Sequence, residues 1–321
     1  MELVSTSALR ARLAAGGFAV TAEISPPRGA SGDPVRRKAD LLRGWVDAVN
    51  VTDNQGAHVR LSSMAGSMVA LSAGLEPIMQ MTCRDRNRIA LQSDLLGASA
   101  LGIRNVLVMT GDHPKFGDHP GAKPVFDLDS IQFLWAARTM RDEGTLMSGR
   151  TLNPPPDCFL GAVENPFAPP AGFRAERLGK KVAAGAQFVQ TQFVFDVPAF
   201  GEWMSQVHDL GLHERCHILA GVGAIRSVRA MEFMADNVPG VYIPEETSRR
   251  LRGVPGDRVA EEGARIAAEV IQQVREIPGV AGVHLLAAGN EAAVPGVLSA
   301  AGLGLRDTVT GDAVAGDSHG R

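Results

Sequence analysis

Residues 105–140 read NVLVMTGDHPKFGDHPGAKPVFDLDSIQFLWAARTM and contain a complete strand–loop–helix unit, which decides the fold class. The run 105–110 is apolar and β-branched, as in a buried strand. The segment 130–140 repeats apolar residues, among them Ile131 and Leu134, at helical spacing. Between them, a loop rich in glycine and proline carries the tetrapeptide Gly-Asp-His-Pro twice. Loops in this position, after a buried strand, often carry the chemistry of an α/β protein.

The same alternation of a short apolar run and a helical segment recurs along the chain. Eight such runs, mostly apolar throughout, predict a parallel sheet covered by helices. A closed (β/α)8 TIM barrel fits that number and the length of 321 residues. An open doubly wound sheet is the alternative, but no GxGxxG motif follows the first run. The predicted strands are 18–25, 48–53, 76–83, 105–111, 159–165, 188–195, 217–223 and 283–288.

The segments between the strands show helical periodicity. In 86–102, Ile89, Leu96 and Ala100 share one helical face. The long connection between the seventh and eighth strands predicts extra helices, including 257–277. We expect one barrel domain over residues 1–303 and a flexible C-terminal tail over 304–321.

Composition excludes several classes of protein. Apolar residues make up 45% of the chain and charged residues 21%, which is ordinary for a soluble globular protein. The net charge is −3 and no long basic run occurs, so we expect no nucleic-acid partner. Three cysteines lie far apart without a CxxC pair, which argues against a disulfide framework or structural zinc. Without a signal-peptide core or a membrane-length apolar run, a cytoplasmic location is expected.

Polar residues follow the predicted strands at the end where a barrel keeps its active site. Solvated loops also place polar residues after strands, so a single one carries little weight. The set as a whole, and Glu23 and Asp112 in particular, favours a functional site. The set consists of Glu23, Thr52, Asp53, Gln80, Thr82, Thr110, Asp112, Glu164, Asn165 and Gln192.

Glu23 carries the sharpest argument of this set. It ends an apolar run and is followed by Pro26 and Pro27, which fix the backbone and end the strand abruptly. A carboxylate inside a barrel mouth is partly desolvated, which raises its pKa and favours a protonated acid near neutral pH. A salt bridge to Arg28, which would keep Glu23 ionised, is the alternative.

The two Asp-His pairs of the 111–129 loop suggest a metal site at first sight. Metal ligands usually converge from rigid elements, whereas this loop has the composition of successive turns. We therefore predict no metal, and interpret the loop as a wall over a bound cofactor with Asp112 pointing inward. Cys83 has no base beside it in sequence and is expected to be a small buried residue.

A basic helix is predicted just beyond the fifth strand. Arg174, Arg177, Lys180 and Lys181 recur three and four residues apart, so one face could bind a diphosphate. A solvated helix face explains the same spacing equally well.

Several long motifs, in order, resemble methylenetetrahydrofolate reductase of the short bacterial type, with the catalytic barrel and no regulatory domain. The resemblance runs from about residue 18 to about residue 300. The motifs are AEISPPRG, VNVTDNQGA, MQMTCRDRN, VLVMTGDHP with the second GDHP and VFDLDS, VENPF, KKVAAGAQFVQTQFVFD and GVHLLAAGNEAAV.

The resemblance implies a barrel that reduces 5,10-methylenetetrahydrofolate to 5-methyltetrahydrofolate with NADH or NADPH, through a flavin, usually FAD. By position, Glu23 matches the general acid that opens the five-membered ring of the folate. Asp112 matches the aspartate beside flavin and pterin, and Gln192 matches a glutamine that contacts folate. The cofactor-binding residues expected at matching or adjacent positions are Thr52, Gln80, Thr82, Thr110, Gly111, Phe126, Ala162, Lys180 and Lys181.

The chain departs from the family pattern around the cofactor. Gln80 stands where the family has a histidine, and Val163 and Leu286 each replace a tyrosine. Arg174 and Arg177 replace an aspartate and an asparagine on the adenosine side. FMN, or a flavin-free enzyme with direct hydride transfer from NADH, are therefore alternatives to FAD.

The expected partners are folate and a pyridine nucleotide, with no nucleic acid and no membrane; a homo-oligomer or a companion subunit stays open. A non-catalytic folate-binding or partner subunit with the same barrel is the alternative function. The presence of both Glu23 and Asp112 counts against it.

Overall fold

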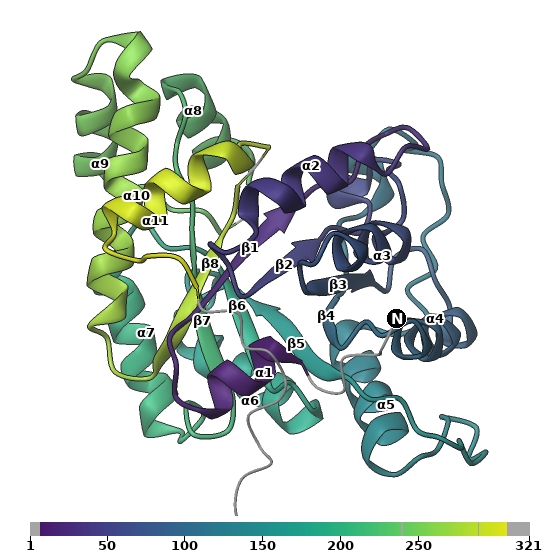
Figure 1. Ribbon diagram of the computed structural model, residues 1–321. Helices are drawn as coiled ribbons and strands as arrows, with labels where there is room; N and C mark the ends of the chain where they lie inside the picture. The colour runs from purple at the N-terminus through teal and green to yellow at the C-terminus, as the bar shows by residue number, and fades with distance from the viewer. Residues whose placement is uncertain (1–6, 239, 288, 307–321) are drawn as a thin grey trace, which may run out of the picture.

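The computed structural model describes residues 7–238, 240–287 and 289–306, in which eight parallel strands close into a barrel (Figure 1). The first strand pairs with both the second and the last, which confirms the TIM barrel and excludes an open sheet. The strands are β1 (Ala19–Ile24), β2 (Ala48–Val51), β3 (Pro77–Thr82), β4 (Asn105–Met109), β5 (Phe159–Glu164), β6 (Phe188–Phe193), β7 (His217–Val222) and β8 (Val280–Leu285).

The eighth strand begins earlier than predicted. It was expected over 283–288, of which residue 288 lies outside the described residues, and it starts instead at Val280. The reason is Gly282, where an added Cβ would lie 2.3 Å from the carbonyl oxygen of Ala19. The backbones of β1 and β8 approach too closely here for any side chain. Since glycine weakens the sequence pattern of a strand, the start of β8 was missed.

Helices surround the barrel on its outer side (Figure 1). They are α1 (Ala8–Ala14), α2 (Asp33–Leu42), α3 (Ser63–Ser72), α4 (Arg88–Ala100), α5 (Ser130–Asp142), α6 (Arg174–Ala184), α7 (Val197–Asp209), α8 (Val228–Asn237), α9 (Glu245–Arg252), α10 (Val259–Arg275) and α11 (Val294–Ala300). The single-turn helices are η1 (Gln55–Ala57), η2 (Pro114–Phe116), η3 (Ala171–Phe173), η4 (Gly256–Arg258) and η5 (Glu291–Ala293). Helices α8, α9 and α10 lie between β7 and β8, which confirms the predicted extra helices.

Helix α4 packs on the barrel with a face other than the one that carries Ile89 and Leu96. It buries Leu91, Leu95 and Ala98, whereas Ile89 is 74% exposed. The helix carries apolar residues on two faces, so its periodicity alone does not select the face that meets the sheet. Ile89 and Leu96 share one face of the helix, as predicted, but that face is not the one that meets the sheet.

The interior of the barrel is apolar at one end and polar in the middle. Helix α1 covers the N-terminal end with Leu9 and Leu13, which join a buried cluster that includes the stacked rings of Phe159 and Phe188. One level higher, four buried polar side chains form a hydrogen-bonded network. They are Thr21, Asn50, Gln190 and His284.

This network fixes the direction of the candidate residues above it. Side chains alternate along a strand, so residues two positions further on point the same way. Glu23 and Thr52 stand two residues after Thr21 and Asn50, at the ends of β1 and β2. They therefore point into the barrel mouth at the C-terminal ends of the strands. Gln192 stands two residues after Gln190, but the register of β6 shifts between Gln190 and Phe193, so alternation does not fix the direction of its side chain.

Two further expectations concern the chain as a whole. The flexible tail predicted over 304–321 lies outside the described residues from 307 onward, and the barrel occupies the part of 1–303 that is described. None of the helices within 7–238, 240–287 and 289–306 is long and apolar enough to span a membrane.

Candidate active site

Glu23 is buried at the end of β1 and forms no ion pair within the described part of the chain. Glu23 is 6% exposed. The alternative considered from the sequence, a salt bridge between Glu23 and Arg28, is not formed. The pKa of Glu23 is raised from 4.5 to about 7, chiefly by burial and secondarily by the negative charge of Glu291. The ammonium of Lys38 and a hydrogen bond from Gln55 act in the opposite direction. The carboxyl group is therefore about half protonated near neutral pH.

The buried acids that follow β2 and end β5 are neutralised by cations. Asp53 Oδ2 lies 2.6 Å from Arg86 Nη1 and accepts hydrogen bonds from the backbone N–H and the hydroxyl of Thr82. Glu164 lies 2.7 Å from Arg177 Nε and 2.9 Å from Lys181 Nζ. Both carboxylates are paired with cations inside the protein, which gives them a structural role at the ends of β2 and β5.

Two polar side chains beside Glu23 have unused hydrogen-bonding capacity. The hydroxyl of Thr52 is fully buried and has no hydrogen-bond partner within the described part of the chain. Gln80 is 7% exposed and makes no hydrogen bond to any residue that the structure describes, and its amide atoms are not among the fully buried ones. Unpaired buried polar groups are rare in folded proteins, and at a barrel mouth they indicate a place for a polar ligand.

The loop that carries the two GDHP motifs is fastened to the segment after β2. The carboxylate of Asp118 accepts a hydrogen bond from Val59 N, and Gly117 lies so close to Ala57 that a Cβ would sit 1.8 Å from its carbonyl oxygen. The ring of His113 accepts a hydrogen bond from Lys115 N. These residues make turns, as their composition predicted. No group of three or more possible metal ligands occurs among the described residues.

Asp112 lies on the rim of the mouth rather than in it. Its side chain is exposed, and its carbonyl oxygen accepts a hydrogen bond from the buried guanidinium of Arg84. The structure therefore fixes the backbone of Asp112 and leaves its carboxylate free to face a bound molecule. Gly111, just before it, has φ +90 and packs against Thr82 and Arg84.

The other expected cofactor residues are more dispersed. The hydroxyl of Thr110 donates to Ser130, and Ala162 is buried in the core between sheet and helices, where its side chain cannot reach the mouth. Phe126 adopts a left-handed backbone conformation with φ +40 at the end of the loop. Gln192 accepts a hydrogen bond from Phe193 N through its Oε1, which leaves its amide N–H groups available. Strand position thus places Glu23, Thr52 and Gln80 at the barrel mouth, whereas Gln192 follows the irregular part of β6 and the rest lie at the edge or outside.

The cations of α6 are largely used within the protein. Arg177 and Lys181 pair with Glu164, and Arg174 donates to the carbonyl oxygens of Phe167 and Ala168. Lys180 lies over the ring of Phe173 at 4.7 Å. A bound diphosphate would have to compete with these contacts, except at the exposed Lys180.

Sequence analysis missed Lys38 and Glu291. Lys38 Nζ lies 2.6 Å from Glu291 Oε1 across 253 positions of sequence, and 3.2 Å from the carbonyl oxygen of Ser25. No local motif marks such a pair. It forms because closure of the barrel places β8 beside β1.

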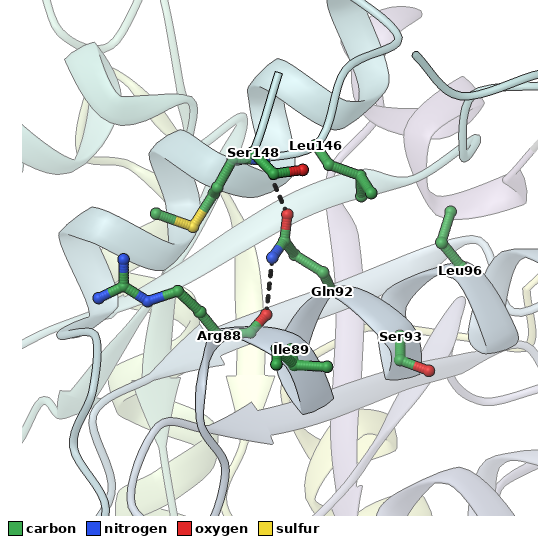
Figure 2. Close-up of a pocket in the computed structure, with 8 residues that line it drawn as sticks. Arg88, Ile89, Gln92, Ser93, Leu96, Leu146 and Ser148 are labelled. Atoms are coloured by element: carbon green, nitrogen blue, oxygen red, sulfur yellow. Dashed lines mark hydrogen bonds between the residues drawn. The ribbon is translucent and has the colours of Figure 1, made fainter. Parts of the chain in front are cut away.

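A cavity of about 500 Å³ lies elsewhere, between α4 and the segment 146–148 (Figure 2). Ile89, Leu96 and Leu146 line it, and Gln92 joins its two sides by accepting a hydrogen bond from Met147 N. Its one charged residue, Arg88, pairs with Asp127. The cavity is on the outer surface of α4, away from Glu23, and holds no group suited to proton or hydride transfer.

Comparison with known proteins places the chain in context. The family model described as methylenetetrahydrofolate reductase matches residues 8–302. A probable methylenetetrahydrofolate reductase (NADPH) of Caenorhabditis elegans is 26% identical over 293 residues, which are 88% of this chain and 42% of that protein. Methylenetetrahydrofolate reductase 2 of Saccharomyces cerevisiae is 27% identical over 251 residues, 74% of this chain and 38% of that protein. The chain thus spans less than half the length of these curated relatives.

Among solved structures, an uncharacterized protein from Clostridium thermocellum that binds two copies of 5-methyl-5,6,7,8-tetrahydrofolic acid has a similar fold. The TM-score is 0.65 at 13% identity, over 92% of this chain and 98% of that chain. At this identity the likeness supports the barrel alone.

Proposed function

Because the chain belongs to the methylenetetrahydrofolate reductase family, we propose that it reduces 5,10-methylenetetrahydrofolate to 5-methyltetrahydrofolate with a hydride from NADH or NADPH. The observation that carries the proposal is the state of Glu23. Among the strand-end acids Glu23, Asp53, Asp112 and Glu164, it alone is both buried and without an ion pair. A buried acid with a pKa of about 7 can hold a proton and release it at neutral pH.

The reaction needs such a proton because the methylene carbon bridges two nitrogens of the folate. In our proposal the Glu23 carboxyl donates its proton to N10 as the C–N10 bond breaks, and the electrons of that bond stay on N10. The lone pair of N5 then forms a cationic iminium with the methylene carbon. A hydride adds to this carbon and gives the methyl group, and Glu23 regains its proton from solvent.

The remaining mouth residues have complementary roles in this proposal. The amide N–H groups of Gln192 are available to hold folate, since its Oε1 is engaged by Phe193 N. The exposed carboxylate of Asp112 supplies negative charge at the rim, where it would stabilise the cationic iminium. Thr52 and Gln80 provide unpaired polar groups that a ligand ring can satisfy.

The unpaired polar groups at the barrel mouth would also suit the ring system of a flavin. Thr52, Gln80, Gly111 and Phe126 are the residues that would hold it there. When bound, a flavin would accept the hydride from the pyridine nucleotide and pass it to the folate. FAD remains our proposed cofactor, with FMN or direct transfer from NADH as outcomes that the assay below distinguishes.

The direct test is product formation by the purified protein. We expect 5-methyltetrahydrofolate from methylenetetrahydrofolate with NADH or NADPH, detected by chromatography and mass spectrometry, and a flavin absorption spectrum that NADH bleaches. Product without any flavin in the preparation would favour direct transfer. Tight folate binding without turnover, with both nucleotides and with added FAD or FMN, would refute the proposal in favour of a non-catalytic folate-binding subunit.

The pH profile of folate reduction is expected to have a limb set by Glu23. Only the protonated carboxyl can donate, so the rate falls as pH rises through the pKa of about 7. Well above that pKa the loss approaches about tenfold per pH unit. Values of kcat/KM for the folate, which report the free enzyme, check this from pH 6 to about pH 9, and a flat profile across the range would contradict it.

Charge reversal of Lys180 is expected to weaken binding of a flavin diphosphate. Lys180→Glu places a negative charge at the exposed position of α6 without disturbing the Glu164 ion pairs, so the affinity should fall about tenfold or more. Arg275→Glu is a matched control, because Arg275 also lies over an aromatic ring, that of Phe18, and Phe18 precedes β1 at the opposite end of the barrel. Fluorescence titration with FAD measures both. Equal FAD affinity in the two variants would show that the diphosphate does not bind at α6.

A further inference from the structure

Two buried carboxylates and one ammonium group meet beside the end of β1. Glu23 and Glu291 are 6% and 5% exposed, and Lys38 Nζ lies 2.6 Å from Glu291 Oε1. Lys38 also donates to the carbonyl oxygen of Ser25, two residues after Glu23. The charge of Glu291 acts on Glu23 across this cluster. If both carboxylates were ionised, the three groups would carry a net charge of −1.

The fold brings these groups together from three separate elements. Glu23 is on β1, Lys38 on α2, and Glu291 on η5, which follows β8. Strand β8 pairs with β1 where the barrel closes, and η5 packs against both β1 and α2. The approach of the two carboxylates is therefore part of the barrel closure.

The cluster has two inequivalent carboxylates. Glu291 contacts the ammonium directly, whereas Glu23 has only the hydrogen bond from Gln55 of η1. Two neighbouring carboxylates in a buried site do not both ionise readily, and the proton goes to the one without a cation. The ring of His284, one level below on β8, is neutral because burial lowers its pKa to about 3. The charges that act on Glu23 are thus those of Glu291 and Lys38.

We propose that Glu291 and Lys38 are positioning residues that together set how tightly Glu23 holds its proton. The Glu291 carboxylate, held in place by Lys38, disfavours a second negative charge on Glu23. Lys38 in turn limits this effect, so that the proton can still be given up. The kinetic consequence rests on the function proposed above, whereas the effect on protonation does not.

A purely structural reading of the same pair is that Lys38 and Glu291 clamp η5 to α2. The two readings predict different results. Loss of a clamp lowers stability or activity at every pH, and it does so in the same direction whichever partner is removed. If instead the pair acts through its charges, removal of either partner shifts the protonation midpoint of Glu23, and the two removals shift it in opposite directions.

The kinetic test compares Glu291→Gln with Lys38→Met. Glu291→Gln removes the neighbouring negative charge and frees Lys38 to attract Glu23, so the midpoint of the pH limb should fall by about one unit or more. Lys38→Met removes the cation, so the proton that the two carboxylates share is held more tightly. The midpoint of the pH limb in this variant should therefore rise by about one unit. Arg265→Met, which breaks exposed ion pairs on α10, is the matched control and should leave the midpoint unchanged.

A second measurement needs no enzymatic activity. The unfolding free energy of each protein is measured from about pH 4 to about pH 9 and compared with that of the same protein carrying Glu23→Gln. The difference between the two curves reports the titration of Glu23 in the folded state. This difference changes with pH up to the pKa of Glu23 in the folded state and then levels off. The pH at which it levels off should lie near 7 in the parent protein, lower in Glu291→Gln and higher in Lys38→Met.

The outcomes separate the two proposals. Opposite shifts in the unfolding data support the inference even if no variant, nor the parent, reduces folate, in which case only the proposed function fails. Midpoints that stay fixed, or that move in the same direction in both variants, overturn the inference while leaving the reductase activity of the parent untouched.

Discussion

Replacement of Glu23 by glutamine is expected to slow the reduction of methylenetetrahydrofolate by at least about 100-fold, since removal of a general acid typically costs about 10² to 10⁴ in rate. Glutamine keeps the size of the side chain and can donate an N–H hydrogen bond, but it cannot release a proton. Oxidation of NADH by a bound flavin involves no ring opening, so that half-reaction should stay close to the parent rate. Stopped-flow measurement of the two half-reactions separates them.

The same variant carries an internal control for its fold. The pKa of Glu23 is raised from 4.5 to about 7, so the folded protein binds this proton more tightly than the unfolded chain does. The contribution of Glu23 to stability is therefore largest below pH 4.5 and declines as pH rises toward 7. Above that range the ionised parent bears a cost of up to about 3 kcal/mol, which glutamine avoids.

Glu23→Gln should consequently unfold at a higher temperature than the parent at pH 8, and at a similar temperature at pH 4, in thermal melts at both values. A variant that is slow, well folded and more stable at high pH fits the proposed acid. A variant that reacts with folate at the parent rate shows that Glu23 donates no proton. If NADH also fails to reduce the flavin, the substitution has altered the site as a whole. The variant Glu23→Asp, which restores an acid one methylene shorter, is then measured instead. Partial recovery of the folate step in this variant supports Glu23 as the acid.

The barrel itself could be predicted because each strand is buried on both sides and each is followed by a helical segment. What periodicity could not supply was the choice between two apolar faces, as on α4, where Leu91 rather than Ile89 meets the sheet. Nor could it supply the start of β8, where Gly282 is required by the proximity of Ala19 and weakens the strand pattern. Both features depend on neighbours that are distant in sequence.

The candidate site shows the same division. Sequence could name the acids that follow strands, because their position depends only on where each strand ends. It could not sort them, because sorting depends on partners that come from other elements. Arg86 reaches Asp53 across 33 positions, and Lys38 reaches Glu291 across 253. The difference between a structural anion and a proton donor therefore appears only in the folded chain.

This sorting leads to the second large effect, on stability. Asp53→Ala is expected to lower the unfolding free energy by about 3 to 5 kcal/mol, because it leaves a partly buried Arg86 without its closest anion. It also removes the acceptor for two hydrogen bonds from Thr82 at the end of β3. Since small domains are stable by only about 5 to 15 kcal/mol, such a loss is a large fraction of the total.

Chemical denaturation of Asp53→Ala beside Glu232→Ala tests this expectation. Glu232 pairs with Arg252 on the surface, with about half of each side chain exposed, and its loss should cost only about 0 to 1 kcal/mol. Asp53→Asn, which keeps an acceptor for Thr82 but loses the charge, should fall between the two. If Asp53→Ala is as stable as the surface control, the ion pair with Arg86 does not hold the ends of β2 and β3. Asp53 would then join Glu23 as an acid whose burial needs a functional explanation, and Thr52 beside it would have to be reinterpreted in the same way.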